Sequence, residues 1–201
     1  MEITKLQYIS DGDLVSIEQY LKGGGRWVQL RMKNKSPEEI VKTGIAVREL
    51  SHKYGATYIL NDNPMLAHLS GADGVHLGKS DGITTAARMI LGDNKIIGRT
   101  AHTIEDIVEI TKSKVDYIGV GALRETATKS NIAGVLGYEG YRDIIKALPL
   151  NIPPIIAIGG VVLEDIHPLL EIGVYGIAVS ALISKSTDIK QTTINICNEL
   201  R

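Results

Sequence analysis

Residues 57–77 read Thr57-Tyr-Ile-Leu-Asn-Asp-Asn-Pro-Met-Leu-Ala-His-Leu-Ser-Gly-Ala-Asp-Gly-Val-His-Leu77. Two short strand-like runs, at 57–60 and 74–77, flank a short helix candidate at 63–69. A strand, a helix and a second strand in this order predict a parallel βαβ unit. The Gly-Ala-Asp-Gly turn at 71–74 fits the helix-to-strand connection, where glycine relieves a left-handed C-cap.

The same alternation extends along the whole chain. Strand-like runs occur at 6–9, 27–30, 57–60, 74–77, 96–98, 117–120, 155–158 and 176–179. Helix candidates lie at 13–21, 63–69, 83–91, 138–148, 163–172 and 188–200, and two more begin at 36–39 and 103–106. The first of these two starts is a capping box with proline at the first helical position. Eight such units predict an α/β fold, a (β/α)8 TIM barrel forming a single domain over 1–201. An open doubly wound sheet is the alternative.

The amino-acid composition limits the kinds of binding partner that we expect for this protein. The net charge is −1 and the isoelectric point is near 6.5, so the whole protein has no attraction to nucleic acid or anionic membrane. We expect small-molecule partners, with no nucleic acid and no membrane. No apolar run approaches the roughly 18 residues of a membrane span and no signal segment is seen, so a cytoplasmic protein is expected. The single cysteine, Cys197, is interpreted as a non-catalytic thiol on the last helix.

In barrels of this kind, active sites form where the strands end, because the βα loops gather there. Gln29 lies in the second strand-like run, Arg31 and Lys33 follow it, and all three share one face if the period of two continues. An amide, a guanidinium and an ammonium would then converge and predict an anion site. A solvated strand end is the alternative interpretation.

Carboxylates follow the next two strands. Asn61-Asp62-Asn63 comes after the third run, and Ser80-Asp81 comes after the fourth. Two carboxylates at adjacent strand ends are suited to Mg²⁺, which takes one or two protein carboxylates together with water and phosphate oxygens. The ordinary structural alternatives are an Asx turn at Asp62 and a helix cap at Asp81. The neighbouring cations favour the magnesium interpretation.

The remaining strand ends offer hydroxyls, an imidazole and glycines. Thr100 and His102 follow the fifth run, although a lone histidine before a helix is more often a cap. The long irregular connection 121–137 predicts an active-site lid carrying Thr126-Ala-Thr-Lys129. Turns after strands seven and eight are recurrent phosphate sites, which makes Gly160 and the 179–180 pair candidates.

These motifs together resemble thiamine phosphate synthases. The order and spacing match at 29–33, 60–62, 71–81, 117–121, 126–129 and 157–160, within a resemblance that covers residues 25–183. The resemblance implies a TIM barrel that joins 4-amino-2-methyl-5-hydroxymethylpyrimidine diphosphate to 4-methyl-5-(2-hydroxyethyl)thiazole phosphate. The products would be thiamine phosphate and pyrophosphate, with Mg²⁺ as cofactor.

The resemblance also implies a role for each matching residue. Metal ligands would be Asp62 and Asp81, and catalytic groups would be Arg31, Thr100 and Lys129. The pyrimidine diphosphate would be bound by Gln29, Arg31, Lys33, Asn61, Thr100 and Lys129. The thiazole phosphate would be bound by Thr126, Ala127, Thr128, Gly160, Val179 and Ser180.

No dedicated nucleophile is evident among these residues, so we expect a dissociative substitution: pyrophosphate leaves first and the thiazole nitrogen captures the pyrimidine carbocation. Charge stabilisation and positioning would supply the catalysis. A thiazole tautomerase on the same barrel, with His102 as acid and base, is one alternative. A non-catalytic sensor that binds thiazole phosphate is another, because a fold does not guarantee an activity. The oligomeric state stays open, a homo-oligomer included.

Overall fold

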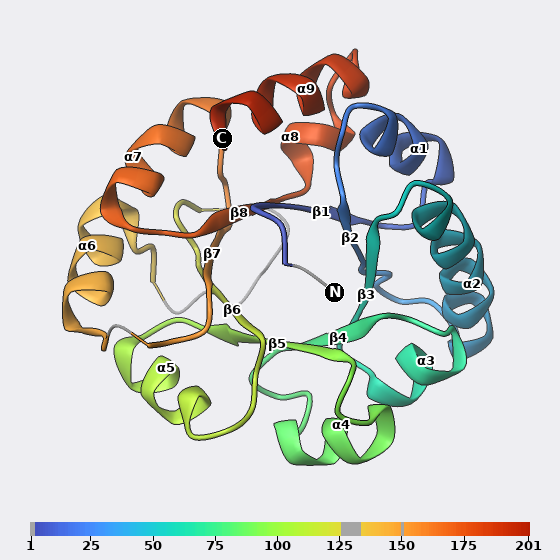
Figure 1. The fold of residues 1–201 in the computed structure, drawn as a ribbon, viewed down its shortest axis with the longest axis horizontal. Helices are drawn as coiled ribbons and strands as arrows, with labels where there is room; N and C mark the ends of the chain where they lie inside the picture. Colours follow the sequence, from blue (N-terminus) through green and yellow to red (C-terminus); the bar gives the residue numbers. More distant parts are fainter. Residues whose placement is uncertain (1–2, 126–133, 150) are drawn as a thin grey trace.

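A computed structural model describes residues 3–125, 134–149 and 151–201 of the chain. In these residues, eight parallel strands form a closed ring surrounded by a ring of helices (Figure 1). The strands are β1 Leu6–Ser10, β2 Trp27–Leu30, β3 Thr57–Asn61, β4 Gly74–Leu77, β5 Ile96–Ala101, β6 Tyr117–Gly121, β7 Ile155–Ile158 and β8 Gly176–Val179. The helices are α1 Leu14–Lys22, α2 Pro37–Lys53, α3 Pro64–Leu69, α4 Thr84–Leu91, α5 Ile104–Thr111, α6 Gly137–Ala147, η1 Leu163–Asp165, α7 Ile166–Ile172, α8 Ala181–Ser184 and α9 Ile189–Glu199.

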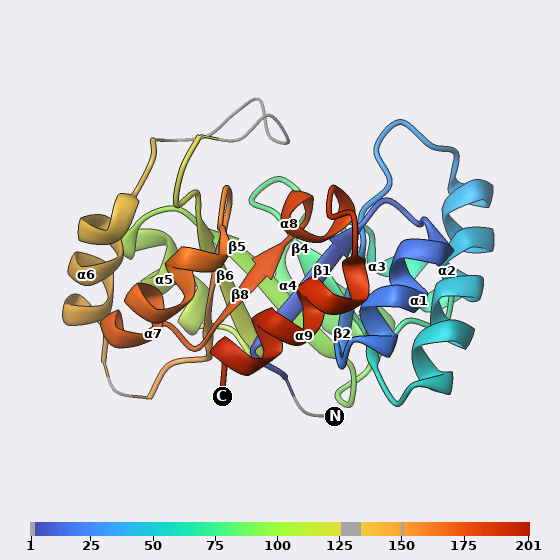
Figure 2. The ribbon, with the colours of Figure 1, turned by 90° about the horizontal axis from the view of Figure 1, so that it is seen from above.

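Pairing between the first and last strands closes the barrel. Leu6 lies opposite Ile177 and Tyr8 lies opposite Val179, so β1 and β8 leave no free edge. The predicted TIM barrel is therefore confirmed, and the open doubly wound sheet was wrong. Figure 2 shows that α8 lies on one side of the barrel, while the C-terminus lies on the other.

Local sequence signals account for most helix starts. The Ser36 hydroxyl accepts from the Glu39 amide at 3.2 Å, and Glu39 accepts in return from the Ser36 amide at 3.1 Å. Thr103 and Asp106 form the same reciprocal pair at α5. The short helix α8 was not anticipated, because four residues carry no detectable apolar period.

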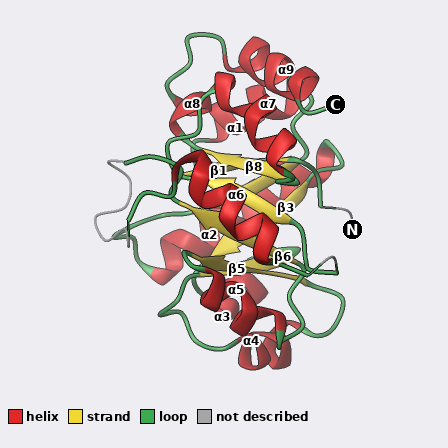
Figure 3. Ribbon diagram, turned by 90° about the vertical axis from the view of Figure 1, so that its left-hand side faces the viewer, coloured by secondary structure: helices red, strands yellow, loops and turns green. Residues whose placement is uncertain are grey.

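The core has two layers. The larger one lies between the strands and the surrounding helices, which enclose the strands in Figure 3. The smaller one fills the inside of the barrel and consists of Trp27, Ile59, Ile96, Tyr117, Ile156 and Ala178. Trp27 packs edge-on against Tyr117, with ring centroids 4.7 Å apart. The barrel is therefore a packed structure, and ligands have access only at its ends.

Two glycines create room for the polar side chains inside the barrel. A Cβ at Gly98 would lie 2.1 Å from the Tyr117 ring, and one at Gly119 would lie 3.1 Å from the His76 ring. Glycine therefore stands at these two strand positions because the Tyr117 and His76 rings occupy the adjoining interior space.

Gly98→Ala is expected to destabilise the protein by about 1–3 kcal/mol, because the buried Tyr117 ring has to shift. Gly119→Ala is the matched control and should cost less, since its contact needs only a small adjustment. Denaturant unfolding measures both. Equal stability of the two variants would contradict this packing explanation.

Two further expectations concern Cys197 and membrane spans. Cys197 lies on α9, half-buried, and burial raises the pKa of its thiol, which lowers its reactivity. Among the described helices, none has both the length and the apolar character that a bilayer span requires.

Candidate active site

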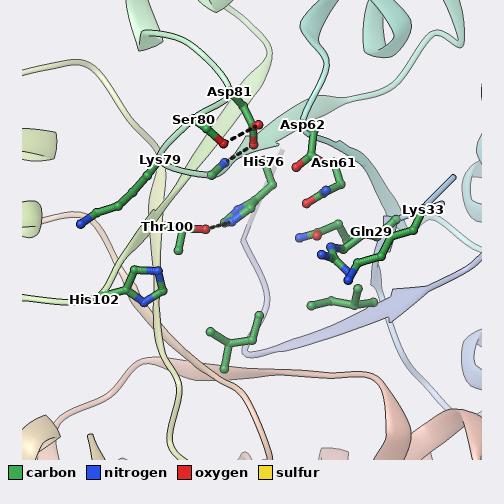
Figure 4. A pocket seen from close by; sticks show the side chains of 14 residues that line it. Gln29, Lys33, Asn61, Asp62, His76, Lys79, Ser80, Asp81, Thr100 and His102 are labelled. Carbon is green, nitrogen blue, oxygen red and sulfur yellow. Dashed lines mark hydrogen bonds between the residues drawn. The ribbon is translucent and has the colours of Figure 1, made fainter. Parts of the chain in front are cut away.

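A pocket of about 300 Å³ opens at the carboxyl ends of the strands (Figure 4). Its lining is strongly polar and comes from the ends of β1 to β5, the loops that follow β2 to β5, and β7. The lining residues are Ile9, Gln29, Arg31, Lys33, Asn61, Asp62, His76, Gly78, Lys79, Ser80, Asp81, Thr100, His102 and Ile158.

The pocket brings together seven of the residues to which the resemblance assigns a role: Gln29, Arg31, Lys33, Asn61, Asp62, Asp81 and Thr100. The argument for the first three was partly wrong, since β2 ends at Leu30 and the period of two does not reach Lys33. Arg31 continues the barrel pairing with one further bond, from its amide to the Ser10 carbonyl at 2.8 Å. The chain then leaves the strand, yet all three side chains still line the pocket.

Asp62 has an unusual backbone. Its φ is +71°, a left-handed conformation that is uncommon outside glycine and is better tolerated by Asp and Asn. Its amide donates to the His76 carbonyl at 2.8 Å, which fixes it against β4. The cap of α3 is the neighbouring Asn63, which accepts from the amides of Met65 and Leu66. Asp62 is therefore held at the pocket in a conformation that capping does not explain.

Asp81 closes the loop after β4. One carboxylate oxygen accepts from the Gly78 amide at 2.7 Å, and the other accepts from the Ser80 hydroxyl at 3.4 Å. Helix α4 starts after Ile83 and receives no side-chain cap. The alternative interpretation of Asp81 as a helix cap was wrong. Its carboxylate instead lies at the pocket on the same side as that of Asp62 (Figure 4).

The donor set of the pocket suits magnesium better than a transition metal. The described residues contain no group of three His, Cys, Asp or Glu side chains arranged to hold an ion. Magnesium does not need one, because it keeps several waters and takes phosphate oxygens beside one or two carboxylates. Asp62 and Asp81 fit that requirement.

The cations of the pocket differ in how they are held. The Arg31 side chain makes no hydrogen bond or ion pair with any part of the chain that the structure describes, which leaves its guanidinium available to an anion. Lys79 is turned away (Figure 4) and pairs with Asp106 on α5 at 2.7 Å. Burial opposes ionisation of Asp106, but its hydrogen bonds to Lys79 and to the amide of His102 hold its pKa below the ordinary value. Lys79 therefore links the loop after β4 to α5.

His76 and His102 also line the pocket, and they are held differently. His102 binds the Gly121 carbonyl through Nδ1, which places the ring proton on Nδ1, because a carbonyl only accepts. His76 contacts Thr100 through Nε2 at 2.8 Å. Sequence reasoning did not select His76, although its inward position at the third residue of β4 was a usable signal.

Comparison with known proteins agrees with this geometry. The family described as thiamine monophosphate synthase matches residues 2–183. The chain belongs to this family. A thiamine-phosphate synthase of Flavobacterium johnsoniae is 44% identical over 97% of this chain and 95% of its own length. One from Phocaeicola vulgatus is 45% identical over 91% and 89%.

One solved structure gives the same family assignment. A thiamine phosphate pyrophosphorylase from Pyrococcus furiosus superposes with a TM-score of 0.87 at 31% identity, covering 98% of this chain and 95% of the other. Orotidine 5'-phosphate decarboxylase from Pyrococcus horikoshii has a TM-score of 0.69 at 15% identity, covering 97% and 99%. That second likeness shows the barrel fold alone.

Three further residues expected of a thiamine monophosphate synthase are described and do not line the pocket. Gly160, Val179 and Ser180 are at the ends of β7 and β8 and are not among its lining residues. Thr126, Ala127, Thr128 and Lys129, within the expected lid 121–137, lie outside the described residues. The structure therefore presents the predicted diphosphate side of the site, except for Lys129, as one surface.

Packing explains the glycine pair after β7. Gly159 and Gly160 have φ of +93° and +70°. A Cβ at Gly159 would lie 2.6 Å from the Ala122 Cβ, and one at Gly160 would lie 2.9 Å from the Arg124 Cβ. The loop after β6 therefore lies directly on this turn.

An ion pair, which sequence reasoning missed, holds the loop after β6 against the turn after β7. Arg124 binds both oxygens of Asp165 and also donates to the Gly160 carbonyl at 3.1 Å. Asp165 is buried, with its side chain 1% exposed, and accepts further bonds from Tyr138 and from the Val162 amide. Burial works against its charge, but the bonds from Arg124, Tyr138 and the Val162 amide together outweigh this and keep the pKa of Asp165 below its ordinary value.

Arg124→Met is expected to destabilise the protein at neutral pH by about 1–2 kcal/mol. The loss is modest because the Arg124 side chain is 44% exposed. Asp165 has a lowered pKa, so its contribution is present above the unfolded pKa near 4 and is lost as the pH falls below it. Denaturant unfolding from pH 7 to pH 3 should show the two proteins converging in acid. Arg142→Met, which removes an exposed pair with Glu139, is the control; a matching loss in that variant would contradict the special role of Arg124.

Proposed function

We propose that the chain is a thiamine-phosphate synthase, which joins the pyrimidine diphosphate to the thiazole phosphate and releases pyrophosphate. The observation that carries this proposal is the pocket that unites Arg31, Lys33, Asp62, Asp81 and Thr100 in a member of this family. Cations, carboxylates and a hydroxyl within one small pocket are suited to a diphosphate with its counter-ion. We also propose a cytoplasmic location, since phosphorylated substrates do not cross a bilayer readily.

The diphosphate is assigned to the described pocket. Arg31 presents a planar guanidinium that matches two phosphate oxygens, and Lys33 adds a point charge. Asn61, Gln29 and Thr100 offer amide and hydroxyl groups. Lys129 is assigned to the same group by resemblance. The thiazole phosphate is assigned, also by resemblance, to Thr126, Ala127, Thr128, Gly160, Val179 and Ser180.

We further propose that the reaction depends on Mg²⁺ held by Asp62 and Asp81. When bound, the ion would neutralise charge on the diphosphate oxygens. Two observations support this proposal: the left-handed backbone at Asp62, which lines the pocket, and the bond from the Gly78 amide to the Asp81 carboxylate.

The residues present favour a dissociative substitution. The bond between the pyrimidine methylene and the diphosphate oxygen breaks, and its electron pair leaves with pyrophosphate. Arg31, Lys33 and Thr100 stabilise that developing charge. The thiazole nitrogen then forms the new carbon–nitrogen bond with the cationic methylene. Among the described lining residues there is no cysteine, and the Ser80 hydroxyl meets the Asp81 carboxylate only at 3.4 Å, so no covalent enzyme intermediate is proposed.

The alternatives make different predictions. A tautomerase would act on a thiazole phosphate without any pyrimidine diphosphate, using His102. The hydrogen bond from Nδ1 to Gly121 leaves only Nε2 for that chemistry, and the relatives reported above are named as synthases. A sensor would bind thiazole phosphate without turnover and without any effect of Mg²⁺.

Mass spectrometry of complete and incomplete reaction mixtures separates the three functions. The synthase forms thiamine phosphate only when both substrates and Mg²⁺ are present. A change in the thiazole compound alone would indicate a tautomerase. Binding of thiazole phosphate with no product, under conditions in which the Flavobacterium johnsoniae relative turns over, would leave the sensor.

A further inference from the structure

A chain of five hydrogen-bonded side chains runs beneath the pocket. Gln29 donates to Gln7 at 3.0 Å, and Gln7 donates to the Tyr117 hydroxyl at 3.3 Å. The Tyr117 hydroxyl contacts His76 Nδ1 at 2.9 Å, and His76 Nε2 contacts the Thr100 hydroxyl at 2.8 Å. These residues come from five different strands. Gln7 and Tyr117 are buried below the pocket and do not line it.

One assignment of donors and acceptors is consistent along all of these bonds. The Tyr117 oxygen accepts from Gln7, and its single buried proton has an acceptor when it points to His76 Nδ1. A neutral imidazole that accepts at Nδ1 carries its proton on Nε2 and donates from there. The Thr100 oxygen accepts that bond. The Thr100 proton is then left for another acceptor, and Thr100 lines the pocket.

We propose that Tyr117 and Gln7 are positioning residues that act through His76 to hold the Thr100 hydroxyl as a donor toward the diphosphate. This rests on the proposed synthase function. A hydroxyl rotates easily between donating and accepting, and only a donor stabilises a departing anion. A donor that is already oriented needs no reorganisation when the charge develops.

Two further features of the barrel support this series of hydrogen-bonded side chains. Gly98 and Gly119 leave the space that the Tyr117 and His76 rings occupy. Burial also raises the pKa of the Tyr117 hydroxyl, so this group keeps the proton that it donates. The buried phenol is therefore a stable donor to His76.

Tyr117→Phe tests the chain with little change in packing, because the ring that contacts Trp27 is retained. We expect kcat to fall about 10-fold and the KM for the thiazole phosphate to stay unchanged. Thr100→Val should lower kcat about 100-fold, and Thr100→Ser should restore most of it. The double variant Tyr117→Phe with Thr100→Val should be no slower than Thr100→Val alone, because both changes remove the same interaction.

Tyr20→Phe is the matched control. Tyr20 is equally buried, and its hydroxyl binds the carbonyls of Leu6 and Trp27, with no link to Thr100. Its kcat should equal that of the wild type. Unchanged kcat in Tyr117→Phe, or effects of Tyr117→Phe and Thr100→Val that multiply in the double variant, would overturn the proposal.

Nitrogen-15 NMR of His76 tests the chain without turnover. In the wild-type protein without substrate, we expect an unprotonated Nδ1 and a protonated Nε2, and a loss of that preference in Tyr117→Phe. A proton on Nδ1 in the wild type would overturn the proposal. Absence of turnover in the wild type would instead reject the synthase function, while the nitrogen spectrum still decides whether Tyr117 sets the tautomer.

Discussion

Asp62→Asn is expected to lower kcat by about 100-fold or more and to weaken magnesium binding, because it removes one of two carboxylates at the pocket. Asparagine suits this test since it is nearly isosteric and tolerates the left-handed φ of +71°. The amide bond to the His76 carbonyl is made by the backbone and survives the change. The variant should therefore fold like the wild type and lack only the charge.

Steady-state kinetics across a Mg²⁺ titration, together with calorimetric binding of Mg²⁺ in the presence of pyrophosphate, measure the effect. Asp93→Asn is the control, because Asp93 lies between α4 and β5 at the opposite end of the barrel. An Asp62→Asn enzyme with the magnesium dependence of the wild type would remove Asp62 from the metal site.

Arg31→Met should reduce kcat/KM for the pyrimidine diphosphate by about 100-fold, since a guanidinium aimed at a leaving anion is lost. Its side chain makes no hydrogen bond or ion pair within the described residues, so its removal should leave stability nearly unchanged. This separates a binding role from a structural one. Arg31→Lys should recover only part of the rate, because an ammonium cannot make the two parallel bonds of a guanidinium.

Arg48→Met is the matched control for charge and length, because Arg48 pairs with Glu49 on α2. Both variants are assayed for kinetics and for thermal unfolding. Equal kcat/KM values in Arg31→Met and Arg48→Met would contradict the assignment of Arg31 to the diphosphate.

Much of the fold could be predicted from the sequence, because its determinants are local. Short apolar runs bounded by turns define the strands, and parallel βαβ units then bring the strand ends to one face. Gln29, Asn61, Asp62, Asp81 and Thr100 converge for that reason, although they belong to four different strands and the loops after them.

The side-chain partners could not be predicted, since they depend on packing across the barrel. Nothing near Gln29 in sequence indicates its bond to Gln7, and Arg124 and Asp165 are 41 residues apart. Lys79 likewise forms its ion pair with Asp106, and not with a group in the pocket, because of where α5 lies. Such contacts become visible only when strands and helices are placed in three dimensions.

Phosphorus-31 NMR of one reaction tests the central claim most directly. With both substrates, Mg²⁺ and the purified protein, the account predicts that pyrophosphate and thiamine phosphate appear in equal amounts as both substrates disappear. The Asp62→Asn protein should form them about 100-fold more slowly. Persistence of both substrate signals, while a thiamine-phosphate synthase from the same family converts them under identical conditions, would contradict the account.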